Sequence, residues 1–162
     1  MRGEAFERLW ESHAKQLLGF LVYRTGDPAL SEDLVADTFE RVLRSRQRFD
    51  PRKSSEKTWI YTIALNRLRD HQRRTDAEGR ALQQVRVSDE PDASMASGIE
   101  ARDDVSRALE VLSEKEHEAI SLRYGGDLTL PEIARLQGEK LSTIQGRVYG
   151  SLRKLREAMD QG

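Results

Sequence analysis

TLPEIARLQGEKLSTIQGRVYGSLRKL, residues 129–155, is the stretch that decides the fold of the C-terminal part of the chain. Ala134 is small where two helices must cross closely, and Gly138 follows four residues later, where the chain must turn sharply. Ile144 comes six residues after that glycine and can anchor a second helix. This spacing predicts a helix-turn-helix.

The second helix of this motif has two different faces. Apolar residues recur along it at spacings of four, four and three, which predicts a buried stripe made of Ile144, Val148, Leu152 and Leu155. The outward positions are small, hydrogen-bonding or cationic, and such side chains suit the major groove of DNA and the phosphates on its rim. They are Thr143, Gln145, Gly146, Arg147, Tyr149, Gly150, Arg153 and Lys154. A basic helical pair can also be plain scaffold, so this pattern alone leaves both interpretations open.

Helix start signals surround the motif. Three capping boxes pair a hydroxyl with a Glu or Gln three residues later, and they predict helices at about 114–124, 130–137 and 143–158, after another at about 100–111. The boxes are Ser113 with Glu116, Thr129 with Glu132, and Ser142 with Gln145.

The N-terminal part also has helical periodicity. Apolar residues from Phe6 to Leu21 recur at helical spacing, and Gly26 should end that helix. Asp27 and Pro28 form a cap and first position for a second helix, and Ser54 or Ser55 caps a third after the loop 49–55. No alternating strand pattern competes, so the fold class is all-α.

Residues 75–99 are rich in Asp, Glu, Ser and Gly and lose most periodicity, which predicts a flexible acidic linker with at most short helical turns around residues 81–85. We therefore expect two small helical domains, residues 1–74 and 100–162, with the helix-turn-helix in the second.

The net charge of -1 conceals strong segregation along the chain. Residues 41–74 carry 11 basic and 3 acidic side chains, and residues 135–156 carry 6 basic and 1 acidic. Acidic segments flank both blocks. This pattern indicates two nucleic-acid contacts, although solvated helix faces can produce similar charge runs, and the acidic linker could mask the basic surfaces.

Composition argues against several other classes. There are no cysteines, so disulfides, thiolate chemistry and cysteine-based zinc sites are excluded. No stretch approaches 18 apolar residues, and the first residues are too charged for a signal peptide, which predicts a soluble cytoplasmic protein without membrane insertion. Asp33 and Asp37 share a helix face without a neighbouring His, and no phosphate-binding glycine loop is present. We expect no catalytic residue, metal, cofactor or small-molecule substrate.

Two motifs in one chain resemble the extracytoplasmic-function (ECF) family of RNA polymerase sigma factors. SEDLVADTFERVLRSRQRFDP followed by TWIYTIALNRLRDHQRR is similar to the family's region two, and LSEKEHEAISLRY followed by the helix-turn-helix is similar to its region four. The resemblance implies that the protein binds core polymerase and promoter DNA and directs transcription initiation. An anti-sigma factor is a further partner that it allows.

The resemblance also assigns residues to roles. It implies core-polymerase binding by Asp33, Leu34, Asp37, Thr38 and Phe39. For the minus-ten element it implies Arg48, Asp50, Lys53, Tyr61, Asn66, Arg69, Arg73 and Arg74. For the minus-thirty-five element it implies Ser142, Thr143, Gln145, Gly146, Arg147, Tyr149, Arg153 and Lys154, with Arg147 the most important contact. Trp59 also falls in the minus-ten motif, but its spacing favours core packing.

Region four departs from the family pattern at three positions. The family usually has an apolar residue where Gln137 and Glu139 stand, and often a cation where Gly150 stands. Glu139 should repel DNA unless it pairs with Lys140 or Arg135. A regulator that binds DNA without polymerase is the alternative function.

For the two domains to reach the minus-ten and minus-thirty-five elements together, the linker must span about two turns of DNA, or about 70 Å. Some 25 extended residues can reach about 80 Å.

Overall fold

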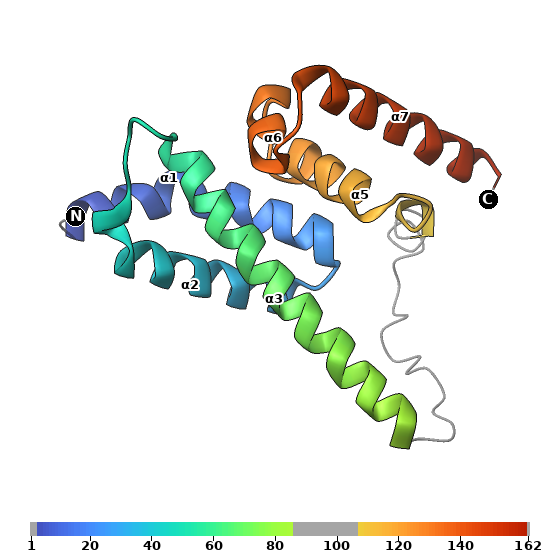
Figure 1. The fold of residues 1–162 in the computed structure, drawn as a ribbon, viewed down its shortest axis with the longest axis horizontal. Helices are drawn as coiled ribbons and strands as arrows, with labels where there is room; N and C mark the ends of the chain where they lie inside the picture. Colours follow the sequence, from blue (N-terminus) through green and yellow to red (C-terminus); the bar gives the residue numbers. More distant parts are fainter. Residues whose placement is uncertain (1–2, 86–106, 162) are drawn as a thin grey trace.

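The computed structural model describes residues 3–85 and 107–161, and within them every regular element is helical (Figure 1). The predicted all-α class is confirmed. The α-helices are α1 (Gly3–Thr25), α2 (Pro28–Arg44), α3 (Glu56–Val85), α5 (Glu114–Ile120), α6 (Leu130–Gln137) and α7 (Leu141–Asp160). A short 3₁₀ turn, η1 (Arg46–Arg48), follows α2, and a π-helical turn, η3 (Ser121–Gly125), follows α5.

The junction of α1 and α2 follows the local sequence signals. Gly26 has a φ of 70°, a left-handed conformation in which glycine ends α1 without strain. The Asp27 carboxylate accepts a hydrogen bond from the Leu30 amide at 3.1 Å, and Pro28 occupies the first helical position. The cap and both predicted helix boundaries are confirmed.

Helix α3 is longer than predicted. Ser55 Oγ accepts the Thr58 amide at 3.1 Å, so Ser55 is the cap and α3 begins at Glu56. The helix then continues past residue 74 to Val85, and its end extends away from the other helices (Figure 1). Residues 75–85 contain mostly Ala, Glu, Gln, Arg and Leu, which are strong helix formers despite the single Gly79. The expectation of a linker over residues 75–85 is therefore wrong, and the rest of that segment lies outside the described residues.

Two of the three predicted capping boxes in the C-terminal part are present. Ser113 and Glu116 exchange hydrogen bonds at the start of α5, and Thr129 and Glu132 do so at the start of α6. The third box is wrong, because α7 begins one residue before Ser142, after Lys140, and has no side-chain cap. Most of the helix predicted at 100–111 lies outside the described residues.

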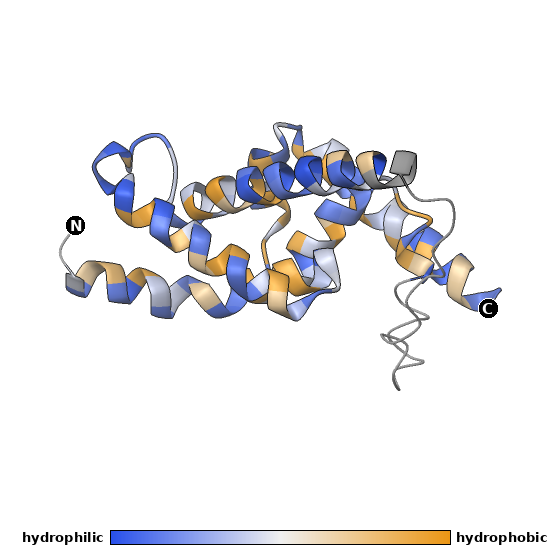
Figure 2. Cartoon of the chain, turned by 90° about the horizontal axis from the view of Figure 1, so that it is seen from below, coloured by the Kyte–Doolittle hydropathy of each residue, from blue (hydrophilic) through white to orange (hydrophobic). Residues whose placement is uncertain are grey.

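One apolar core joins the N-terminal and C-terminal helices. It includes Leu17, Phe20 and Leu21 from α1 as well as Leu122 from η3 and Ile133 from α6. Apolar residues line the inner faces of the helices, and hydrophilic residues lie outside (Figure 2). The two helical units therefore pack against each other, and α1 contacts η3 while α3 contacts α6.

Candidate nucleic-acid interface

The turn between α6 and α7 has the geometry of a helix-turn-helix. Gly138 has a φ of 66°, and a Cβ atom there would meet nothing within 4 Å, so the backbone conformation alone requires glycine. Ala134 is 7% exposed and Ile144 is fully buried, as expected for the crossing point and the anchor. The predicted motif is confirmed.

Helix α7 presents a polar face to solvent. Ile144 and Val148 pack inward, whereas the tyrosine ring of Tyr149 is 59% exposed. Most of the residues predicted to contact the minus-thirty-five element lie on the solvent side: Ser142, Thr143, Gln145, Gly146, Tyr149, Arg153 and Lys154. Lys154 Nζ also forms an ion pair with Glu116 of α5 at 2.9 Å. A helix with this face can enter a groove, with cations at its C-terminal half near phosphates.

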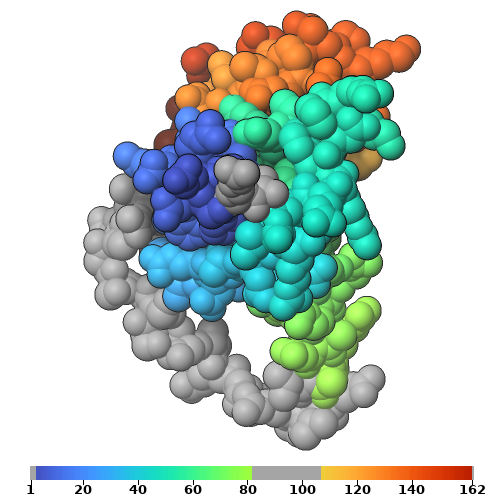
Figure 3. All heavy atoms as spheres, turned by 90° about the vertical axis from the view of Figure 1, so that its left-hand side faces the viewer, coloured from blue at the N-terminus to red at the C-terminus, as the bar shows by residue number. Residues whose placement is uncertain are grey.

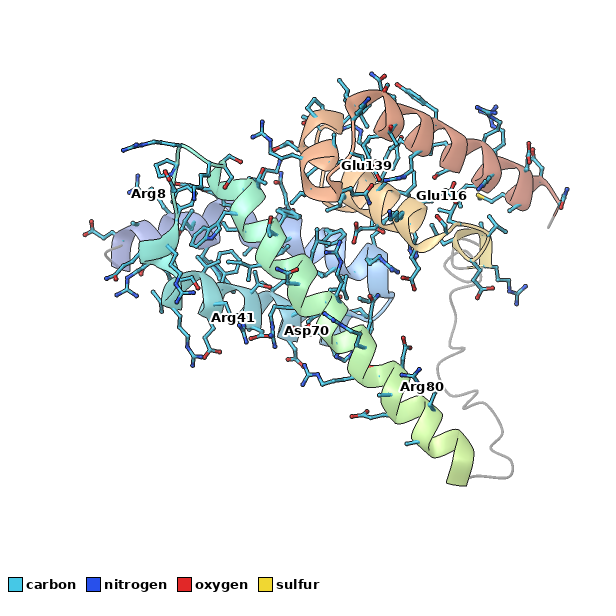
Figure 4. The ribbon with its side chains drawn as sticks, in the orientation of Figure 1. Arg8, Arg41, Asp70, Arg80, Glu116 and Glu139 are labelled. Atoms are coloured by element: carbon cyan, nitrogen blue, oxygen red, sulfur yellow. The ribbon has the colours of Figure 1, made fainter. Side chains whose placement is uncertain are left out.

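Arg147 differs from its neighbours on α7. Its side chain is only 14% exposed, its Nη1 donates to Gln137 Oε1, and its Nη2 lies 3.4 Å from Glu139 Oε1 (Glu139 is labelled in Figure 4). Glu139 also lies 3.8 Å from Lys115 Nζ, so it pairs with Arg147 and Lys115, and not with Lys140 or Arg135, the two partners that the sequence offered. Gln137 and Glu139, the positions that depart from the family pattern, thus fasten Arg147 to the turn.

The residues predicted to bind polymerase divide between the surface and the core. Asp33 is exposed and Asp37 is partly exposed. Leu34, Thr38 and Phe39 are 6%, 0% and 1% exposed, and Thr38 Oγ1 donates to its own helix at Leu34 O. These three side chains cannot meet a partner in this arrangement, because they face the helices packed against α2. Here they hold α2 in place, and their contact with polymerase stays a prediction.

A network of ion pairs, which the sequence motif did not indicate, connects α2 to α3. Arg67 Nε lies 2.6 Å from Asp37 Oδ2, and Arg67 Nη1 lies 3.4 Å from Asp70 Oδ2. Asp70 in turn binds Arg73 at 2.7 Å (Asp70 is labelled in Figure 4). The three-residue spacing of Arg67, Asp70 and Arg73 was a visible signal of pairing along one helix. The connection to Asp37 needed the tertiary structure.

All five cations predicted for the minus-ten element are accessible. Arg48, Lys53, Arg69, Arg73 and Arg74 are exposed, as is Asn66. They lie along α3 and the α2–α3 connection, which protrudes at the surface in Figure 3.

Three other residues of the minus-ten motif make contacts within the protein. They are Asp50, Trp59 and Tyr61. Asp50 Oδ1 accepts the Arg52 amide at 2.9 Å and shapes the turn, and the Trp59 ring packs on Phe49 at 4.9 Å, as the packing interpretation predicted. Tyr61 is fully buried, with its ring 5.9 Å from that of Phe20. Burial, helped by the negative charges of Glu132 and Asp127, raises the Tyr61 pKa. The Tyr61 side chain is inaccessible in this arrangement, and its DNA contact stays a prediction.

Neither a metal cluster nor a membrane span is found in the described parts of the chain. Within residues 3–85 and 107–161, no three His, Asp or Glu side chains gather as ligands would. No helix in these ranges has the length and apolar character needed to cross a bilayer.

Comparisons with known proteins match both halves of the chain. Residues 9–78 match the family model of Sigma-70 region 2, and residues 108–157 match that of Sigma-70 region 4. RNA polymerase sigma factor CarQ of Myxococcus xanthus is 33% identical over 98% of this chain and 91% of its own. ECF RNA polymerase sigma factor SigK of Mycobacterium tuberculosis is 28% identical over 96% of this chain and 86% of its own.

Solved structures agree with this fold. The sigma factor RpoE of Bartonella quintana, in complex with the anti-sigma factor NepR, matches with a TM-score of 0.76 at 24% identity, over 97% of this chain and 98% of that one. CnrH, in complex with the cytosolic domain of CnrY, matches with a TM-score of 0.67 at 22% identity, over 99% of this chain and 90% of that one. Two region models in the family's order, a relative matched over nearly the whole chain and the helix-turn-helix geometry agree, and the chain belongs to the ECF family of RNA polymerase sigma factors, which direct transcription initiation at promoters.

Proposed function

We propose that this sigma factor divides promoter recognition among three surfaces: α2 for core polymerase, the 46–55 connection and α3 for the minus-ten element, and α7 for the minus-thirty-five element. The observation that supports this division most directly is the distribution of exposed charge. Glu32 and Asp33 are exposed near the start of α2, whereas exposed cations lie in the middle of α3 and on the C-terminal half of α7. These cations are Arg69, Arg73, Arg74, Arg153, Lys154 and Arg156. In domain terms, residues 1–74 act as region two, 75–99 as the connection and 100–162 as region four.

On α2 the proposed polymerase contact is ionic. Asp33 is free to meet a cation, and Asp37 can do so if it leaves or shares Arg67. The side chains of Leu34, Thr38 and Phe39 support the helix from behind. A surface carboxylate that meets a complementary cation increases association rate and specificity.

At the minus-ten element the task is to hold unstacked bases while cations follow the backbone, because unstacking costs a few kcal/mol per step. The exposed cations and hydrogen-bond donors for this task are Arg48 and Lys53 from the connection, with Asn66, Arg69, Arg73 and Arg74 from α3. Asp50 acts by shaping the turn that carries Lys53.

At the minus-thirty-five element the proposed base contacts come from the first half of α7 and the phosphate contacts from its second half. Thr143, Gln145 and Tyr149 are exposed hydrogen-bonding groups in the first part. Arg153 and Lys154 follow as cations, and DNA would have to draw Lys154 from Glu116. Arg147 acts through the turn it fastens.

The protein acts in this proposal as a cytoplasmic initiation factor and catalyses no reaction itself. An anti-sigma factor is a further proposed partner, since the structurally similar RpoE of Bartonella quintana is found in complex with one.

Run-off transcription with purified core polymerase tests this proposal. Core polymerase with this chain should yield specific transcripts from genomic fragments, and core polymerase alone should not. Asp33→Lys should weaken binding to core polymerase by about tenfold or more, because a cation then faces a cationic partner. Glu78→Lys makes the same charge change on the exposed end of α3 and should leave that affinity unchanged. Equal effects of the two variants, or no transcript from any fragment, would contradict the assignment.

A further inference from the structure

The two halves of the protein meet at a contact that only glycine permits. A Cβ atom on Gly19 of α1 would lie 2.5 Å from the carbonyl oxygen of Gly125 in η3. A Cβ on Gly125 would lie 2.8 Å from the Gly19 oxygen and 2.8 Å from Tyr23 Cβ. Real Cβ atoms do not approach other atoms this closely, so any side chain at either position would push the backbones apart.

Ion pairs across the same contact involve cations of α3. Arg69 lies 3.3 Å from Glu118 of α5, and Lys57 lies 3.3 Å from Glu132 of α6. Glu118 is mostly buried, with 12% of its side chain exposed. The carboxylates of the C-terminal half therefore occupy cations on the helix that, in the proposed function, faces the minus-ten DNA.

A third polar contact joins the ends of α1 and α5. Arg24 Nη1 and His117 Nδ1 lie 3.1 Å apart, so the guanidinium donates to the ring when the histidine proton is on Nε2. Apolar side chains fill the space between these polar contacts, because Phe20, Leu122 and Ile133 are all fully buried in one cluster. A glycine contact, an apolar core and three polar pairs together make a specific interface.

This closed arrangement does not fit simultaneous binding of both promoter elements. Helix α6 lies between α3 and α7 and packs on both. Packed helices are 8–10 Å apart, so two such spacings separate α3 from α7 by on the order of 20 Å. The two promoter elements lie about 70 Å apart along DNA. The halves must separate before α3 and α7 can each reach their element.

We propose that the contact of α1 and α3 with α5, η3 and α6 is an autoinhibitory latch, which keeps the free protein closed and uses Glu118 and Glu132 in place of DNA phosphates. The masking of Arg69 rests on its proposed minus-ten role, whereas the closure itself rests on the geometry alone. The closed state lowers apparent DNA affinity by the fraction of open molecules, so a protein that is about 10% open would bind about tenfold more weakly than an open variant.

Alanine at the contact glycines tests the latch in the full-length chain. Gly19 and Gly125 lie within helical segments at negative φ, so alanine suits the local backbone and should act only by forcing the halves apart. Gly79→Ala is the matched control, since a Cβ there meets nothing within 4 Å. Because the chain has no native cysteine, Asp76→Cys with Glu114→Cys gives two exposed sites for a pair of dyes, one on each side of the contact and both lining one hollow of the closed form.

Energy transfer between the dyes should fall in Gly19→Ala and Gly125→Ala and stay at the parent value in Gly79→Ala, with equal helix content by circular dichroism. Unchanged transfer in both contact variants would overturn the latch. Binding of a fluorescent single-stranded DNA oligonucleotide should become about tenfold tighter in the opened variants. Opening without any gain in DNA affinity would overturn the inhibitory role.

A second pair of variants separates this proposal from the assignment of the minus-ten surface. Glu118→Gln with Glu132→Gln removes both carboxylate charges while glutamine can still complete the capping box at Thr129. This double variant should also lower energy transfer and increase DNA binding. In the opened background, Arg69→Ala should reduce DNA affinity. If Arg69→Ala leaves DNA affinity unchanged, the minus-ten role of Arg69 is wrong. The energy-transfer measurement still tests whether the two halves are held closed.

Discussion

Replacing Arg147 by alanine should destabilise the C-terminal half by about 2 to 3 kcal/mol. The charged guanidinium donates to Gln137 Oε1, and a hydrogen bond from a charged group contributes about 1.5–3 kcal/mol. The partly exposed pair with Glu139, at 3.4 Å, adds at most about 0.5–1 kcal/mol. Arg147→Lys keeps the charge but loses the fork that reaches both partners, so it should cost nearly as much.

Urea unfolding followed by circular dichroism measures this cost, and Arg153→Ala is the matched control. Arg153 is exposed on the same helix, so its removal should change the free energy of unfolding by less than about 0.5 kcal/mol. DNA binding should instead be affected by Arg153→Ala. If Arg153 contacts a phosphate, its removal lowers the slope of binding affinity against salt concentration by about one unit. The reasoning is refuted if Arg147→Ala leaves stability unchanged and instead relaxes base specificity, because Arg147 would then be a direct contact.

Three further results are expected. Gly138→Ala should destabilise the protein by about 1 kcal/mol or more because of its positive φ, whereas Gly79→Ala should be neutral or stabilising, and comparison of their urea midpoints checks this. Phe39→Ala should cost about 3–5 kcal/mol in unfolding free energy because its ring is buried, and a polymerase-binding defect at unchanged stability would contradict its place in the core. Burial, followed by the charge of Arg24, lowers the pKa of His117 from 6.5 to about 4, so the folded state prefers the neutral ring. Stability should therefore fall as pH decreases through the window from 6.5 to about 4, and His117→Gln should flatten that part of the profile; identical profiles would exclude this cause.

Local signals in the sequence were sufficient for most of the helix boundaries. Gly26, Asp27 and Pro28 determine the α1–α2 junction through backbone conformation and one cap, and Gly138 determines the turn of the helix-turn-helix in the same way. Such effects act within a few residues. They can therefore be predicted without knowledge of the packing.

The features that the sequence did not indicate are side-chain environments that depend on tertiary packing. The motif that contains Leu34, Thr38 and Phe39 cannot distinguish residues that touch a partner from residues that hold the helix beneath, because both kinds recur together. The periodicity of α7 places Arg147 among the outward residues, and only the packing of the turn brings Gln137 and Glu139 beside it. The contact of Gly19 with Gly125 joins positions far apart in the chain, and nothing local marks either glycine as part of an interface.

The length of α3 has a consequence for promoter spacing. As a helix, residues 75–85 advance the chain by only about 16 Å, whereas the same residues fully extended would cover about 36 Å. The reach of about 80 Å expected for an extended connection over 75–99 therefore decreases to about 60 Å, below the roughly 70 Å between the two elements. The range of spacer lengths between the promoter elements that the protein can bridge then depends mainly on the direction of the C-terminal end of α3. The length of the extended chain matters less.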